Sequence, residues 1–597
     1  MPKSSAKTSG FSIAALLRIA RREGWRFGLG VLALGGTTAL GLAIPWSLAR
    51  AVDALHRRAP DALSVTGQSV LFIVTFASLQ AAFRTTSRIL IFNAARDVEY
   101  NVRTTLFAHL LKLPQSFYQR HPTGDLMSRM TNDVTAVRML FGAGVLNFAN
   151  TLIVYVATVV LMVNLSGRLT AVALIPLPIV ITLAQLSSRR IYHASRELQD
   201  EMGRLSTHLQ EDLAGITTLR AYGLEALRSE KFEAKNQAYL RRSLQLVRTR
   251  GILGPLFAIT GGIGTLIVLW MGGHEVLGGR MTVGQLVAFN AYLAYLAWPT
   301  LALGWVLSLW QRGLAGWSRI AAVLETPAEA QPETASIPAR QPILEARNLK
   351  IEREGRTVIH DVSFRLAPGE TLAIVGGTGG GKSTLCDAIL RLCEVGHGQL
   401  FLDNVDVREL KLSDLRRICA YAPQDAFLFS ATIDENIAFG SRREDPSAGA
   451  RNARLRAAQT AGLSRDLKEF PAGIDTVVGE RGITLSGGQR QRVALARALA
   501  ADGQLLILDD ALSSVDAETE REILLNLIPI MKNRSTIIVS HRVAAVAHAD
   551  EILVLEGGRV VARGKHADLS MVDGPYARLY REQLGESNAA RAAGEVA

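Results

Sequence analysis

Six long stretches without charged residues constrain the fold of this 597-residue chain more than any other feature. Each is long enough to cross a hydrocarbon core about 30 Å thick as a helix that rises roughly 1.5 Å per residue. They predict an α-helical membrane domain with six spans over residues 27–324. The stretches are Phe27–Ala49, Leu63–Phe83, Met139–Gly167, Leu169–Ser188, Gly251–Gly273 and Met281–Gln311.

The distribution of positive charge predicts which ends of these spans face the cytoplasm. Six Lys and Arg lie in residues 1–26 and twelve in residues 189–250, whereas the joints near Arg168 and Arg280 carry one each. Positively charged flanks favour the cytoplasmic side. We therefore expect a multi-pass protein of the cell membrane, inner or plasma, with a cytoplasmic N-terminus. The flank 1–26 is expected to include an amphipathic helix on the membrane surface.

Two polar segments, residues 94–138 and 189–250, are helical in pattern and fall on the cytoplasmic side. They predict membrane helices that continue beyond the bilayer as long cytoplasmic arms and then return. Each segment is broken near its midpoint, at Leu113–Gln115 and at Leu213–Thr217. The tips of the arms are therefore candidates for contact with the cytoplasmic part of the chain.

Composition fits a chain divided between lipid and water. It is 48% hydrophobic and yet carries a formal charge of +12, because apolar residues concentrate before Gln311 and basic residues lie in flanks and arms. Nucleic-acid binding is the alternative explanation of the charge, but no basic patch is interleaved with aromatic residues, so no nucleic-acid partner is expected. The three cysteines, Cys386, Cys393 and Cys419, have no metal-like spacing and indicate reduced thiols.

The pattern changes after the last span. Residues 325–343 are rich in proline and lack periodicity, which predicts a linker. Residues 344–583 alternate short apolar strands with helical stretches, as an α/β nucleotide-binding domain does. Residues 584–597 are polar and rich in alanine, and we expect a disordered tail there.

A glycine-rich phosphate-binding loop, G-x-x-x-x-G-K-[ST], lies between the strand-like run Leu372–Val375 and the helix-like run Leu385–Leu392. Its glycines let backbone N–H groups turn toward phosphate, and the helix N-terminus adds partial positive charge. We expect Lys382 to reach the β- and γ-phosphate oxygens and Ser383 to hold Mg²⁺. The candidate nucleotide-binding residues are Gly376, Gly379, Gly381, Lys382, Ser383 and Thr384.

A second element of the same chemistry is the apolar run Leu505–Asp509, which ends in a carboxylate. An Asp at the carboxyl end of a strand beside the phosphate loop would orient Mg²⁺ and its water. Such a run is common by chance, but in one domain with the phosphate loop it becomes a strong indication of a Walker B strand.

Between these two elements lies Leu485-Ser486-Gly487-Gly488-Gln489, followed by a helix-like stretch. This LSGGQ sequence resembles the signature of the ATP-binding cassette (ABC) transporters. Six spans followed by one cassette resemble an exporter half-transporter over nearly the whole chain, and Thr123–Asp133 is similar to the first cytoplasmic arm of multidrug-type exporters.

The resemblance implies further roles, residue by residue. Gln424 matches the Q-loop glutamine that contacts Mg²⁺ and the attacking water, Ser513–Asp516 resembles the D-loop, and His541 the switch histidine at the γ-phosphate. Thr476–Gly482 is similar to the segment that touches the membrane arms. In this family two cassettes pack head to tail, so that each ATP lies between the phosphate loop of one and the signature of the other. A chain with one cassette must therefore pair with a second cassette chain.

Two departures from the family pattern matter most. The family places a Glu after the Walker B Asp to polarise the attacking water, and this chain has Asp510, which is one methylene shorter; a misplacement of about 1 Å can cost roughly a hundredfold in rate. Where many cassettes stack an aromatic ring on adenine, this chain has Arg353, whose guanidinium can also stack on a purine.

These departures resemble the degenerate subunit of heterodimeric exporters. A heterodimer with a second half-transporter is therefore favoured over a slow homodimer, which the intact His541 keeps open. The expected catalytic residues are Asp510, His541 and Gln424; Ser383, Gln424 and Asp509 are expected to hold Mg²⁺; and ATP is expected to contact Arg353, the phosphate loop and Leu485–Gln489.

The sequence thus predicts an ABC-type ATPase that drives export of a hydrophobic or amphipathic compound, drug-like or lipid-like, with the ATP-binding domain in the cytoplasm. Two rivals remain: an ATP-regulated channel or regulatory subunit, and an importer of a siderophore-like compound built on the exporter architecture. A soluble cassette protein of DNA repair is excluded by the six spans.

Overall fold

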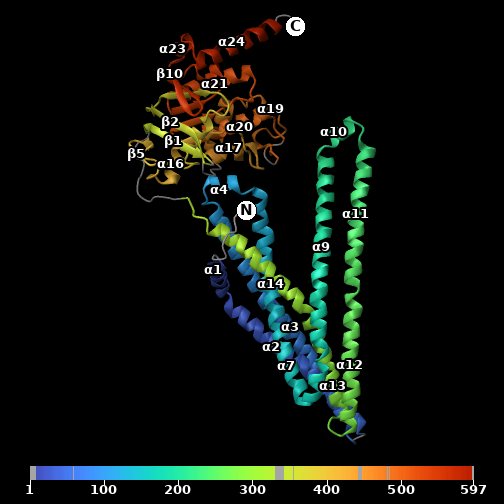
Figure 1. Ribbon diagram of the computed structural model, residues 1–597. Helices are drawn as coiled ribbons and strands as arrows, with labels where there is room; N and C mark the ends of the chain where they lie inside the picture. The colour runs from blue at the N-terminus through green and yellow to red at the C-terminus, as the bar shows by residue number, and fades with distance from the viewer. Residues whose placement is uncertain are drawn as a thin grey trace. The chain divides into compact units, whose positions relative to one another are not determined.

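The computed structural model describes residues 9–57, 60–329, 342–353, 355–441, 447–479, 482 and 484–594. The chain forms two compact units (Figure 1). The helical unit consists of Met1–Leu111 and Pro122–Pro327, and the α/β unit of Lys112–His121 and Ala328–Ala597.

The helical unit is built from long apolar helices, as the uncharged stretches predict. Among the described residues, four helical stretches are long and apolar enough to cross a membrane, namely Gly24–His56, Ala62–Leu110, Thr123–Leu165 and Val283–Leu324. The elements of the unit are α1 (Ser9–Arg21), α2 (Gly24–His56), α3 (Ala62–Leu110), α5 (Thr123–Ser128), η1 (Arg129–Asp133), α6 (Val134–Met139), η2 (Leu140–Gly144), α7 (Val145–Leu165), α8 (Gly167–Ala173), α9 (Pro176–Ala214), α10 (Ile216–Ala221), α11 (Glu225–Gly251), α12 (Leu253–Leu277), α13 (Val283–Tyr295) and α14 (Ala297–Leu324).

Six spans are consistent with this arrangement. The predicted span Leu169–Ser188 falls on α8 and the start of α9. The predicted span Gly251–Gly273 falls on α12, within which Gly262–Leu277 is a shorter apolar helix. Pro176 begins α9, which is where proline is compatible with a helix. The fold class expected from the sequence, a helical membrane domain with an α/β domain, is confirmed.

The second arm is a pair of long helices, α9 and α11, that lie side by side (Figure 1). The predicted break is confirmed, because α9 ends at Ala214, but the chain reverses only after the short helix α10, at Gly223 with φ +61°. An ion pair between Asp212 and Arg228 joins the two helices near this tip. Within α11, all of which is described, only Leu246 is buried.

The first arm breaks where the sequence predicts. Helix α3 ends at Leu110, and the next helix, α4 (Gln115–Arg120), begins at Gln115. The tip of this arm, Lys112–His121, belongs to the α/β unit. There the Lys112 carbonyl accepts a hydrogen bond from the Glu329 N–H at 2.8 Å, and the Glu329 carboxylate pairs with Arg416 at 3.3 Å.

The described part of the α/β unit contains two sheets. The larger has the order β10-β9-β3-β8-β7-β6, in which β3 is parallel to β8 and β9, and β7 is parallel to β6 and β8; the smaller, antiparallel sheet has the order β2-β1-β4-β5. The strands are β1 (Leu344–Arg353), β2 (Arg356–Leu366), β3 (Thr371–Gly376), β4 (Leu400–Leu402), β5 (Val405–Asp406), β6 (Cys419–Ala422), β7 (Leu505–Asp509), β8 (Ser535–Val539), β9 (Glu551–Glu556) and β10 (Arg559–Gly564).

Every residue of β7 and β8 is buried, as expected of central parallel strands. Helices surround the sheets and bury two apolar clusters against them. These are α15 (Lys382–Ile389), α16 (Leu412–Ile418), α17 (Ile433–Ser441), α18 (Ala448–Thr460), α19 (Asp466–Glu469), η3 (Gly473–Asp475), α20 (Gly487–Ala500), α21 (Ala517–Met531), α22 (Val543–Val546), α23 (His566–Met571) and α24 (Pro575–Gly594).

The C-terminal segment differs from the expectation. Residues 584–594, expected to be part of a disordered tail, continue helix α24. Alanine has the highest helix propensity, so an Ala-rich segment can extend a helix that is already nucleated by packing. The linker expected over 325–343 lies between the end of α14 and the start of β1, and its residues 330–341 lie outside the described part of the chain.

Close packing of α17 on α20 gives a first prediction. A Cβ on Gly440 would lie 1.9 Å from the carbonyl oxygen of Arg497, a backbone atom that cannot rotate away. Gly440→Ala is therefore expected to lower the free energy of unfolding of the α/β unit by about 2–3 kcal/mol. Thermal unfolding of the full-length protein measures the effect. Gly449→Ala is the matched control, because a Cβ on this helical glycine would meet only Ser447 Oγ at 4.0 Å; an equal loss in both variants would contradict the argument.

Candidate ATP-binding and hydrolysis site

The phosphate loop connects β3 to α15, between the strand and the helix that the sequence predicts. Gly379 and Gly381 have φ values of +78° and +92°, which glycine adopts without the strain of a side chain. Gly376 is needed for another reason: a Cβ there would lie 2.1 Å from the carbonyl oxygen of Leu555 on β9. The loop can take this compact path only because glycine stands at these positions.

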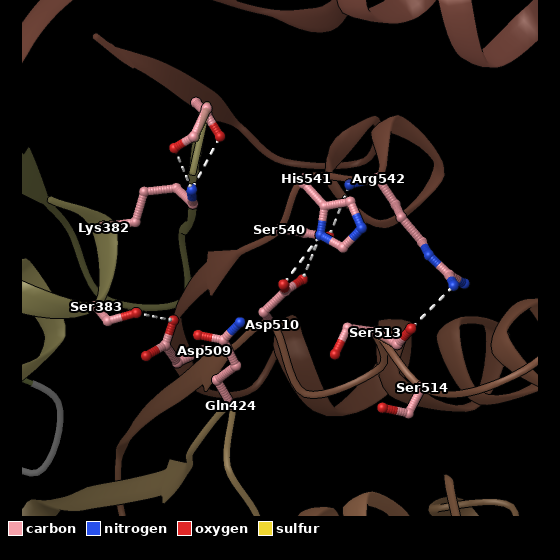
Figure 2. A network of polar contacts seen from close by, with 12 residues as sticks. Lys382, Ser383, Gln424, Asp509, Asp510, Ser513, Ser514, Ser540, His541 and Arg542 are labelled. Carbon is pink, nitrogen blue, oxygen red and sulfur yellow. Dashed lines mark hydrogen bonds and ion pairs between the residues drawn. The ribbon is translucent and has the colours of Figure 1, made fainter. Parts of the chain in front are cut away.

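Lys382 begins α15 and turns its side chain back over the loop (Figure 2). Its ammonium donates hydrogen bonds to the carbonyl oxygens of Gly376 and Gly377, both at 2.9 Å. Burial lowers the pKa of Lys382, and the carboxylates of Asp510 and Asp509 oppose that shift. The partly desolvated cation above a helix N-terminus favours binding of an anion such as phosphate.

Ser383 and Asp509 form an oxygen-rich group beside the loop. The Ser383 hydroxyl donates to Asp509 Oδ1 at 3.1 Å, and Gln424 lies next to them in Figure 2. Asp509 is 2% exposed, and burial raises the pKa of its carboxyl group.

This group fits Mg²⁺, which prefers oxygen ligands and usually takes few from the protein when a nucleotide supplies phosphate. Among the described residues no cluster of three or more His, Cys, Asp or Glu side chains could hold a metal ion alone. A bound Mg²⁺ would neutralise phosphate charge.

Asp510 and His541 are in direct contact, although 31 positions separate them in the chain. His541 Nδ1 lies 3.0 and 2.9 Å from the two carboxylate oxygens of Asp510 (Figure 2). The contact follows from the sheet, because β7 and β8 are parallel neighbours and the Asp510 N–H donates to the Val539 carbonyl at 2.8 Å. Asp510 has φ +48°, a left-handed conformation that Asp tolerates better than most residues.

An open cavity of about 970 Å³ unites these groups. It brings together most residues that the sequence singles out, and it adds a set from β9 and α24. The expected residues that line it are Arg353, Gly376, Gly379, Gly381, Lys382, Ser383, Thr384, Gln424, Asp509, Asp510 and His541; the added ones include Glu556, Pro575, Arg578, Leu579 and Glu582.

The contribution of α24 was missed by sequence reasoning, because its residues form no known motif. Pro575, which begins the helix, was the available signal for a helix start. Arg353 lies at the cavity where the sequence places an adenine contact, and its guanidinium forms an ion pair with Asp387 of α15. Burial raises the pKa of Asp387.

The signature begins α20. Ser486 and Gln489 form a reciprocal capping box at the helix N-terminus, and the Gln489 side chain also donates to Asp466 at 2.9 Å. Leu485 is buried, whereas Gly487 has room for a side chain, with Ser514 Cβ at 3.7 Å as its nearest neighbour. Among the described residues, those that line the cavity do not include Leu485–Gln489.

Two further side chains connect the loops around the site. Gln491 of α20 donates to Ser513 Oγ at 2.8 Å and to the Gln424 carbonyl at 3.3 Å, and it accepts from the Ser514 N–H at 2.8 Å. Arg542 donates to the carbonyl oxygens of Ser513 and Val515 at 3.1 and 3.2 Å and pairs with Glu520. The segment Ser513–Val515 is thereby tied to Gln424, to α20 and to the loop that carries His541 and Arg542. Of the segment Thr476–Gly482, residues 480 and 481 lie outside the described part of the chain.

This fold and site define an ATP-binding cassette protein joined to a membrane domain. Residues 27–300 match the model of the ABC transporter transmembrane region, and residues 359–513 match the model described as ABC transporter. The chain therefore belongs to the ABC transporters. It is a multi-pass membrane protein and an ABC-type ATPase and translocase that binds ATP.

Known relatives cover almost the whole chain. The multidrug resistance-like ATP-binding protein MdlA of Escherichia coli (strain K12) is 33% identical over 573 residues, which are 95% of this chain and 96% of that protein. The ATP-dependent lipid A-core flippase of Aromatoleum aromaticum is 34% identical over 552 residues, 89% of each chain. A bacterial Atm1-family ABC exporter with ATP bound has the same fold, with a TM-score of 0.78 and 28% identity over 94% of this chain and 99% of that one.

Proposed function

We propose that this protein uses ATP to export a hydrophobic or amphipathic compound, drug-like or lipid-like, across the cell membrane. The observation that carries the proposal is an ATP site with phosphate loop, carboxylates and switch histidine in one cavity, on a chain that also holds apolar membrane helices. The names of relatives in the two classes, multidrug resistance and lipid A-core flippase, support the class of cargo. The N-terminus and the α/β unit lie in the cytoplasm, as the basic flanks indicate.

In this proposal, ATP places its phosphates on the loop Gly376–Thr384 and its adenine against Arg353. Ser383, Gln424 and Asp509 hold Mg²⁺. Asp510 accepts a hydrogen bond from the attacking water, and His541 keeps the Asp510 carboxylate oriented and contacts the γ-phosphate.

The functional assembly is a heterodimer with a second ABC half-transporter. ABC exporters act as dimers, and among the described residues the signature Leu485–Gln489 does not line the cavity of its own chain, so we assign it to the ATP of a partner. Asp510 is shorter than the family's Glu, which makes the site on this chain slow, and the partner then provides the Glu for the competent site. One observation favours a slow homodimer as second candidate: Asp510 lies at hydrogen-bond distance from His541, as an acting pair would.

The experiment that tests the assembly is a pull-down of the chain, tagged after Ala597, from its native membrane in mild detergent, followed by intact-mass analysis. The expected result is one different half-transporter at one-to-one stoichiometry. A complex made only of copies of this chain would overturn the heterodimer and leave Asp510 as the available carboxylate. Transport of the cargo against a gradient in vesicles tests export itself.

Lys382→Ala separates the two ATP sites. Loss of a half-buried cation that meets phosphate is expected to weaken nucleotide binding at the site of this chain about 10- to 100-fold. Turnover of the heterodimer should retain more than about half its rate, because the partner's site performs most hydrolysis. Photolabelling with azido-ATP and steady-state ATPase measure the two effects. Lys411→Ala, an exposed lysine at the start of α16, is the control; complete loss of turnover in Lys382→Ala would contradict the asymmetry.

A further inference from the structure

The switch loop, Ser540–Val543, lies between the end of β8 and the short helix α22. Its Ser540 N–H donates to the Ile374 carbonyl of the sheet at 3.2 Å, and its Arg542 N–H donates to Ser540 Oγ within the loop at 3.0 Å. The position of His541 therefore depends on what holds the other polar groups of this loop.

Gln583 of α24 holds two of them. Its side-chain oxygen accepts a hydrogen bond from the Val543 N–H at 2.8 Å, and its side-chain nitrogen donates to the His541 carbonyl at 2.7 Å. An amide is suited to this task because it offers one acceptor and one donor side by side. The two bonds fix the main chain on both sides of Arg542.

The helix that carries Gln583 is firmly anchored. Tyr576 is 1% exposed and lies in the apolar core, and its hydroxyl is 2.7 Å from His566 Nδ1. Residues seven apart lie on the same face of a helix, so Gln583 projects from the face that Tyr576 buries. Ala577 is buried as well, and Leu579 packs against the same core. Helix α24 thus offers a rigid support for the loop.

We propose that Gln583 is a positioning residue for ATP hydrolysis. It holds the main chain of the switch loop so that the His541 imidazole stays against the Asp510 carboxylate. The side chain of His541 is about half exposed, so the loop that carries it contributes to its geometry beside the contact with Asp510. The C-terminal helix α24 thus takes part in ATP turnover, although it contains no known sequence motif.

The first test is Gln583→Leu in the full-length protein, reconstituted in lipid nanodiscs with a partner whose own ATP site has been inactivated, so that turnover reports hydrolysis at the site of this chain. We expect the turnover number to fall about tenfold, since a displacement of about 1 Å in a reacting group can cost up to a hundredfold, and the KM for ATP to stay within about twofold. Each measurement is repeated in an Asp510→Glu background, so that a slow wild-type site does not hide the effect.

A second readout is independent of activity. Hydrogen exchange with mass spectrometry should show the Val543 amide exchanging at least about tenfold faster in Gln583→Leu, because its acceptor is gone. Gln583→Glu separates the two bonds: it keeps the acceptor for Val543 but faces the His541 carbonyl with a second oxygen, so protection should persist while turnover falls.

Arg581→Ala is the matched control on the same helix, because Arg581 is exposed and, among the side chains that the structure describes, pairs with the exposed Asp573. It should leave turnover and exchange unchanged. Unchanged turnover or unchanged exchange in Gln583→Leu, or an equal effect of Arg581→Ala, would overturn the proposal. A raised KM together with a lowered melting temperature would show a purely structural role and would overturn it as well.

Discussion

Replacing Gly487 with Asp is expected to lower ATP turnover of the assembled transporter about a hundredfold or more. Gly487 is the first residue of α20, where the helix N-terminus carries partial positive charge and free N–H groups. In the head-to-tail dimer that we propose, this end faces the γ-phosphate of the partner's ATP. A carboxylate there would repel the phosphates and occupy their hydrogen-bond donors.

The variant should fold, because the nearest atom to a Cβ at Gly487 is Ser514 Cβ at 3.7 Å, an ordinary contact. Gly487→Asn is the control of equal size without the charge, and it should lose much less activity. Steady-state ATPase gives the rates, and azido-ATP labelling of the chain's own phosphate loop should be unaffected. Equal rates for Gly487→Asp and the unaltered protein would show that this signature completes no competent site.

Asp510→Glu is expected to raise hydrolysis at the site of this chain about 10- to 100-fold. The added methylene extends the carboxylate by about 1 Å toward the attacking water, a displacement that can change a rate by two orders of magnitude. The side chain of His541 is about half exposed, so it can yield to the longer side chain while the backbone of Asp510 keeps its bond to Val539.

Single-turnover hydrolysis in a complex whose partner site has been inactivated measures this effect. Asp510→Asn is the matched control, since it keeps the size of Asp510 and removes its negative charge, and it should hydrolyse more slowly than the unaltered chain. A rate for Asp510→Glu no higher than that of the unaltered chain would mean that the length of this side chain does not limit the site.

Local patterns predicted the phosphate loop and its flanking elements well. Gly379 is required by its positive φ, and Lys382 places a cation at the start of a helix. Both residues belong to the motif that the sequence shows. The break at the tip of the first arm was similarly visible, because Pro114 cannot continue a helix.

What could not be predicted depends on contacts between distant parts of the chain. The pairing of Asp510 with His541 requires β7 and β8 to be parallel neighbours, which no spacing reveals. The part of α24 that lines the cavity depends on how its Tyr576 packs into the core. Residues 584–594 continue this helix because packing nucleates it, whereas composition alone suggested disorder.

The arm formed by α9 and α11 has a consequence for the life of the protein in the cell. Near its tip, Leu213 and Tyr222 are 63% and 74% exposed, and along α11 Leu240 and Val247 are 55% and 61% exposed. We expect the partner in the proposed heterodimer to cover these side chains, so that a copy without its partner presents them to chaperones and proteases, which recognise such surfaces. We therefore expect the abundance of this chain to follow the supply of its partner, with surplus copies degraded.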